Sequence, residues 1–116
     1  MSETQDNKFV LDLRDRKGRL VIYSRSNFER HLTRHPEMTG HIEAIKKVVE
    51  DPDIEIETDN NHTYLYRTGV AEGKFSKLWL FVVVKYEGSS TKGEGFIKTA
   101  FFTSKIAKDG RVIWKR

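Results

Sequence analysis

The sequence predicts an α+β fold in which two short helices pack on an antiparallel sheet. In the first half of the chain, apolar residues recur at helical spacing in two segments that Pro36 separates. From residue 54 onward the pattern changes to short apolar runs divided by polar turns, which indicates strands. Consecutive strands joined by short turns form an antiparallel meander, and helices cover one of its faces. We therefore expect an N-terminal β-hairpin and two short helices packed on a four- to five-stranded antiparallel β-meander.

The N-terminal part supplies the hairpin and the first helix. The segment FVLDLRDRKGRLVIY has two alternating apolar runs around the turn DRKG, which is typical of a β-hairpin. The SNFE that follows is a capping box, in which Ser26 accepts from the backbone of Glu29 and the Glu29 carboxylate reaches back. This predicts a helix over residues 27–34.

Pro36 divides this helix from the next one. Proline disfavours the α conformation at the preceding residue, so the first helix should end at His35. Proline also suits the first position of a helix, so a second helix is expected from Pro36 to about Glu50.

The rest of the chain predicts strands. IEIET and TYLYR flank the turn DNNH, KLWLFVVVKY reads as the central strand, GFIKTAFFTS as the next, and KDG turns into a final RVIWK. With 116 residues, one domain is expected over residues 9–116, after a disordered tail over residues 1–8.

Composition excludes several classes of protein. The chain has no cysteine, which rules out disulfides, thiolate metal sites and cysteine nucleophiles. The polar start MSETQDNK lacks the apolar core of a signal peptide. The longest apolar run, LWLFVVV, is too short to span a bilayer. We therefore expect a cytoplasmic protein with no membrane contact.

The charge balance is mildly basic. Lys and Arg number 21 against 17 Asp and Glu, a net charge of +4, and the C-terminal third carries many of the lysines. Such a distribution can form a basic face that attracts phosphates. The alternative is that these lysines only keep strand edges and loops soluble.

Three of the four histidines, His31, His35 and His41, lie within eleven residues. A zinc site needs ligands that converge, but Pro36 separates the helices that carry them and the chain has no cysteine to complete a set. We therefore expect no metal and no cofactor, with His31 packed against the apolar face of its helix and His41 facing solvent.

His35 has a clearer chemical case because it directly precedes the second predicted helix. The positive end of that helix would keep its imidazole neutral, as a general base requires, and Arg34 acts in the same direction and can hold a phosphate. A histidine at such a junction can equally be a capping group.

Two segments carry a resemblance to a known group of proteins. FERHLTRHPEMTGHIEAIKKVVEDPD, followed at a distance by GFIKTAFFTSKIAKDGRVIW, resembles the barnase–EndoU–colicin–RelE (BECR) RNases, most closely their small phage-associated and toxin-like members. Its most specific parts are RHPE at residues 34–37 and TAF at residues 99–101. The resemblance implies metal-independent cleavage of RNA, in which the ribose 2′-OH attacks the adjacent phosphate and leaves a 2′,3′-cyclic end.

That reaction assigns roles to three residues. His35 would act as the base or the acid, Thr99 would orient the phosphate, and Arg67 would stabilise charge in the transition state. We predict that RNA binds to Arg34, Tyr64, Tyr66, Lys98 and Thr103. If residues alternate strictly along their strand, Ile97, Thr99, Phe101 and Thr103 share one face.

The chain departs from the pattern at Phe101, where relatives often carry tyrosine, and no second acid–base residue is evident in its last strands. The leading hypothesis is a toxin-like endoribonuclease whose partners are RNA and an acidic inhibitor protein. A non-catalytic module that binds RNA or a protein on the same face is one alternative. A metal-binding protein that uses His31, His35 and His41 is the other.

Overall fold

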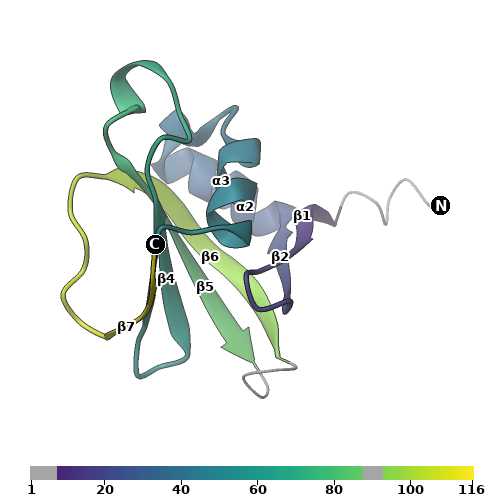
Figure 1. Cartoon of the computed structure of the whole chain (residues 1–116). Helices are drawn as coiled ribbons and strands as arrows, with labels where there is room; N and C mark the ends of the chain where they lie inside the picture. The colour runs from purple at the N-terminus through teal and green to yellow at the C-terminus, as the bar shows by residue number, and fades with distance from the viewer. Residues whose placement is uncertain (1–7, 88–92) are drawn as a thin grey trace.

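The computed structural model describes residues 8–87 and 93–116 (Figure 1). Of the predicted disordered tail, all but Lys8 lies outside these residues. In chain order the elements are β1 (Phe9–Arg14), β2 (Leu20–Ser24), α2 (Arg25–Arg34), the 3-10 turn η1 (Pro36–Met38), α3 (Ile42–Glu50), β3 (Ile54–Glu57), β4 (His62–Arg67), the 3-10 turn η2 (Gly73–Phe75), β5 (Trp79–Glu87), β6 (Glu94–Thr103) and β7 (Arg111–Lys115).

Within the described residues the seven strands form one sheet in the order β1-β2-β6-β5-β4-β3-β7. The predicted meander is present, since each of the strands β3, β4 and β5 pairs antiparallel with the next strand along the chain, up to β6. Two pairings enlarge it into a mixed sheet. β7 returns to pair with β3, and β2 pairs parallel with β6 at two positions. The α+β class is confirmed, and the predicted number of strands was too low.

Glycine permits the parallel contact between the hairpin and the meander. Val21 of β2 lies opposite Gly95 of β6. A Cβ atom built on Gly95 would lie 2.7 Å from Val84 Cγ1 and 2.8 Å from the ring of Tyr86. Only a residue without a side chain fits beneath these two groups, so the position at which β2 pairs with β6 depends on this glycine.

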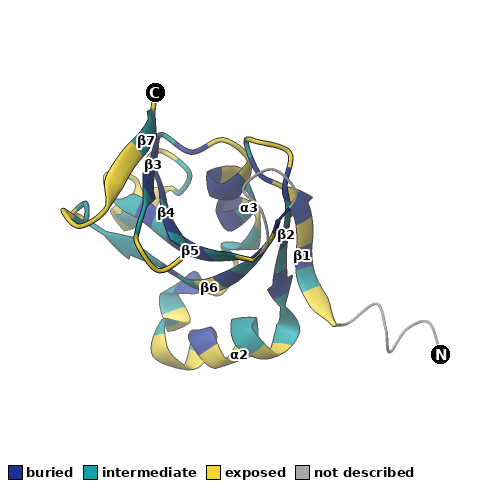
Figure 2. Cartoon of the chain, turned by 90° about the horizontal axis from the view of Figure 1, so that it is seen from below, coloured by how far each residue is buried: buried dark blue, intermediate teal, exposed yellow. Residues whose placement is uncertain are grey.

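The sheet bends around α3, which lies inside the curve (Figure 2). α3 contacts β1, β4 and β5 through its apolar face, and Ala44, Ile45, Val48 and Val49 are buried there. The strands contribute a matching set of buried side chains to this main core: Leu11, Leu13, Val21, Tyr23, Leu65, Leu80, Val82, Val84, Ile97 and Ala100. We call this concave side the α3 face and the convex side the outer face.

Both helices begin at different residues from those predicted. α2 starts at Arg25, and its N-cap is Ser24, whose hydroxyl accepts from the Asn27 backbone N–H at 3.2 Å, so the predicted cap at Ser26 was wrong. α3 starts only at Ile42, because Gly40 has a φ of +83° and interrupts the helix that was predicted from Pro36.

The two helices do not share one face of the sheet. α2 packs against β2 and β6, and it lies outside the curve that encloses α3 (Figure 2). The buried Tyr23 hydroxyl, at the end of β2, lies 2.6 Å from Nδ1 of the buried His31. This hydrogen bond fixes α2 to the hairpin and confirms that His31 is a packed residue.

Buried charges join the β1–β2 turn to the far part of the sheet. Asp15 accepts from Arg19 Nε at 2.8 Å and from the Tyr86 hydroxyl at 2.7 Å. Glu55 of β3 faces Arg16 at 3.3 Å and Arg19 at 3.9 Å. Charged groups are buried only when they are paired, so this network closes one end of the curved sheet.

Candidate nucleic-acid interface

A bulge in β6 decides which residues reach the outer face. Val84 pairs with Ile97, but the next residue, Val83, pairs with Thr99, so Lys98 is an extra residue in its strand. Ile97 therefore belongs to the α3 face, and the predicted strict alternation from Ile97 to Thr103 was wrong. Lys98, which strict alternation would direct toward α3, is exposed.

Beyond the bulge, the outer face is rich in aromatic rings. Phe101 lies opposite Phe81 of β5, with ring centroids 5.0 Å apart. The Phe81 ring lies 4.9 Å from that of Tyr66 and 5.3 Å from that of Tyr64, both on β4. Trp79 extends the row beside Tyr66 at 6.3 Å. Phe81, Phe101, Tyr64 and Trp79 remain partly accessible, so the row presents ring surfaces to solvent.

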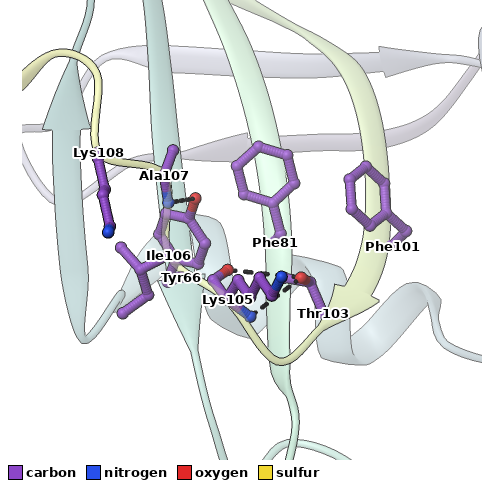
Figure 3. Close-up of a pocket in the computed structure, with 8 residues that line it drawn as sticks. All are labelled: Tyr66, Phe81, Phe101, Thr103, Lys105, Ile106, Ala107 and Lys108. Carbon is purple, nitrogen blue, oxygen red and sulfur yellow. Dashed lines mark hydrogen bonds between the residues drawn. The ribbon is translucent and has the colours of Figure 1, made fainter.

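A hollow of about 500 Å³ lies on this face (Figure 3). Its apolar wall consists of the rings of Tyr66, Phe81 and Phe101. The segment from Lys105 to Lys108, which leads from β6 to β7, forms the opposite rim. The Ala107 N–H donates to the Tyr66 hydroxyl at 2.9 Å and fixes this rim. The hollow thus combines ring surfaces with two exposed lysines, Lys105 and Lys108.

The two tyrosines on β4 are uncharged at neutral pH. Burial raises the pKa of Tyr66, and burial together with the nearby Asp109 raises the pKa of Tyr64. The partly accessible ring of Tyr64 is available for stacking, whereas Tyr66 is buried and its hydroxyl accepts from the Ala107 N–H. Neither neutral phenol would serve as a base.

His35 lies at the edge of this row of rings. Its imidazole stacks on Phe101 with centroids 5.0 Å apart and an interplanar angle of 23°. Its Nδ1 lies 3.5 Å from a carboxylate oxygen of Glu37, and both side chains are about one-third exposed. The predicted reason for a neutral ring at His35 was wrong, because a three-residue 3-10 turn and not a long helix follows it. A facing carboxylate is the neighbour that the structure gives it.

Most of the predicted site residues gather here, and one does not. Thr99 and Thr103 flank Phe101 on the outer face, together with Tyr64 and Tyr66. Arg34 is exposed at the end of α2, directly before His35, and Lys98 is exposed at the bulge.

Arg67 lies on the α3 face, because it pairs with Leu80. Its guanidinium donates to the Asp51 carboxylate at 2.8 Å and to the Asp51 carbonyl at 2.5 Å. The structure therefore does not bring Arg67 together with His35 and Thr99. Through these hydrogen bonds to Asp51, Arg67 instead ties the end of α3 to β4.

The other histidines do not join His35. The ring of His41 packs edge-on against Phe75 and Phe102, so the prediction that it faces solvent was wrong. Its Nδ1 is buried without a hydrogen-bond partner among the described residues. Over the same part of the chain, no group of three or more His, Asp or Glu side chains is placed to hold a metal ion.

The sequence did not identify Phe81, Trp79 and Glu37 as parts of the interface. Phe81 and Trp79 belong to the continuous apolar run of β5, where periodicity does not separate the two faces. Glu37 belongs to the RHPE segment of the resemblance but received no role there, because its position opposite His35 depends on how η1 folds back.

Comparison with protein-family models, curated proteins and solved structures gives no match to this chain. Membership of the BECR group therefore stays a prediction from the two sequence segments. None of the helices in the described parts of the chain is long and apolar enough to cross a membrane.

Proposed function

We propose that the outer face of β4, β5 and β6 binds single-stranded RNA. The observation that carries this proposal is the row of partly accessible rings beside a hollow rimmed by lysines. Unpaired bases stack on aromatic side chains, and each such stack is worth about 1–3 kcal/mol. Three neighbouring strands, β4, β5 and β6, each carry rings of this row, so a sheet and not a loop offers the surface.

The charges around the rings favour a nucleic acid over an apolar protein partner. Lys105 and Lys108 rim the hollow whose wall is formed by the rings of Tyr66, Phe81 and Phe101. Cations beside a stacking surface match the alternation of bases and phosphates along a single strand. The resemblance to the BECR RNases favours RNA over DNA.

Cleavage of the bound RNA is the second candidate function, and the pairing of His35 with Glu37 favours it. The reaction needs one group to take the proton of the 2′-OH and another to give a proton to the departing 5′-oxygen. Glu37 as carboxylate and His35 as imidazolium can fill these roles, while the 2′-oxygen bonds to phosphorus and the bond to the 5′-oxygen breaks. Thr99, two residues from Phe101, would hold a phosphate oxygen.

The binding proposal is tested with two neighbouring phenylalanines. Phe101 lies on the outer face and Phe102 on the α3 face, against Phe75. Replacing either ring by leucine keeps an apolar side chain of similar size. We expect Phe101→Leu to weaken binding of a fluorescently labelled, unstructured RNA by about 5- to 100-fold, the loss of one stacked base. Phe102→Leu is the matched control and should bind as the wild type does. Equal affinity of all three proteins would contradict the proposal.

Cleavage is tested separately, with labelled RNA in EDTA. The wild type should produce 2′,3′-cyclic ends, and both His35→Ala and Glu37→Gln should lower the rate by about 100-fold or more. His41→Ala, in a histidine that packs against Phe75 and Phe102, is the control. Binding without cleavage by the wild type would leave a non-catalytic RNA-binding module and eliminate the second candidate.

A further inference from the structure

Three exposed cations lie beside the ring-bearing face, where α2 meets β6. Arg30 and Arg34 are one turn apart on α2 and share one side of the helix. Lys98 comes from β6, against which α2 packs. We call Arg30, Arg34 and Lys98 the α2 cation cluster.

The packing of α2 against β6 brings Lys98 toward the two arginines of the helix. The pKa of His31 agrees with this arrangement. Burial is the main cause of its lowering, and the charges of Arg30, Arg34 and Lys98 lower it further. Neither Arg34 nor Lys98 forms an ion pair within residues 8–87 and 93–116, and Arg30 donates to the neutral amide of Asn27.

The bulge in β6 is what brings Lys98 into this cluster. Regular pairing through residues 97–99 would place Lys98 on the α3 face, where the neighbouring Ala100 is buried. The extra residue instead leaves Lys98 exposed, next to Thr99 of the outer face. The cluster is also continuous with the rings, because Arg34 directly precedes the histidine that stacks on Phe101.

We propose that the α2 cation cluster is a phosphate-binding extension of the RNA site, over which the strand leaves the ring-bearing face and continues along α2. The inference rests on the proposed function, since it assigns the path of the same RNA. It implies two separate parts: rings that bind the bases of a short segment, and cations that bind only the backbone of a longer one. Affinity for long RNA should then depend on salt more steeply than affinity for short RNA.

The test compares the binding of an unstructured tetranucleotide and an unstructured dodecanucleotide RNA across a series of salt concentrations. The variant is the triple substitution Arg30→Gln, Arg34→Gln and Lys98→Gln, and circular dichroism checks that it folds. Lys17→Gln, in the β1–β2 turn, is the matched control for loss of an exposed cation. Each phosphate contact on single-stranded RNA contributes about 0.7 to the slope of log affinity against log salt.

We expect the triple variant to lower the slope for the dodecanucleotide by about 2, and to leave the slope for the tetranucleotide unchanged. An unchanged slope for the dodecanucleotide would overturn the inference while RNA binding stands. An equal loss for both RNAs would also overturn it, because the cations would then belong to the ring-bearing site. If the wild type binds neither RNA, the proposed function fails, and this extension fails with it.

Discussion

The imidazole of His35 stacks on the ring of Phe101, with their centroids 5.0 Å apart and their planes inclined by 23°. The two residues are 66 positions apart, and this contact brings the end of α2 to the outer face of β6. It links the first segment of the BECR resemblance to the second, so that RHPE and TAF meet in space.

The stack should be measurable as a coupling in stability. His35→Ala and Phe101→Leu, made singly and together, form a double-mutant cycle read by urea unfolding. Stacked aromatic pairs contribute about 0.5–1.5 kcal/mol beyond their buried area, and the His35–Phe101 pair is expected toward the lower end because the imidazole is half-buried. His35→Ala with Phe102→Leu is the control cycle and should be additive. Additivity in both cycles would show that the stack does not hold α2 in place.

Arg67→Ala should leave RNA binding and any RNA cleavage unchanged. Its guanidinium binds Asp51 on the α3 face, away from the rings. Hydrogen bonds from Arg67 and then Arg116 lower the pKa of Asp51, so the substitution should raise that pKa toward its ordinary value of 3.8. NMR titration of the carboxyl group measures this shift. A loss of RNA cleavage in Arg67→Ala would restore the catalytic role that the sequence predicted.

The stability of the fold should fall as the pH is lowered through the ordinary range of histidine. Burial lowers the pKa of His31 below 6.5, so the unfolded chain takes up this proton more readily than the folded one. The stability that the neutral His31 ring gives the folded chain is complete above pH 6.5. It is lost as the pH falls from 6.5 toward the lowered pKa of the folded state. The comparison with His31→Gln isolates the contribution of this one histidine.

Urea unfolding at several pH values measures how the protonation of His31 changes the stability of the fold. The free energy of unfolding should change less with pH in His31→Gln than in the wild type between about pH 7 and pH 5. Identical pH profiles for the two proteins would mean that His31 takes up a proton equally well in the folded and unfolded chains.

Glu55→Ala should be strongly destabilising. Its carboxylate is 3% exposed and faces Arg16 and Arg19, so its removal leaves buried positive charge without this partner. Breaking a buried ion pair from one side costs about 3–5 kcal/mol. Glu57→Ala on the same strand removes an exposed pair with Arg111 and should cost less than about 1 kcal/mol. Thermal or urea unfolding compares them, and equal effects would show that the network is not needed to close the sheet.

Local sequence patterns accounted for the strands of this protein and for the end of its first helix. The hairpin around DRKG, the four strands of the meander and the final RVIWK are all present, because alternation and turn residues act within a few positions. The end of α2 at Arg34 also follows locally from Pro36. The packing of His31 follows from its place on the apolar side of its helix.

Tertiary structure decided the pairings between distant strands and the composition of the candidate site. The parallel contact of β2 with β6 and the return of β7 to β3 depend on which sheet edges are free after the chain has folded, and no short segment encodes that. The bulge at Lys98 reversed the face of Ile97 relative to Thr99, because one extra residue shifts a period of two. Arg67, which we predicted to act with His35 and Thr99, lies on the α3 face because successive residues of β4 alternate between the two faces of the sheet.

The contacts of His35 with Phe101 and Glu37 show most directly which features the sequence determines and which only the tertiary structure decides. The sequence determined that His35 lies at a break between two helical segments, since a proline acts on its immediate neighbour. Only the folded chain decided that the break faces β6 and that η1 turns Glu37 back onto the imidazole. Such contacts join residues through space, and their energy comes from packing that exists only once the sheet has formed around α3.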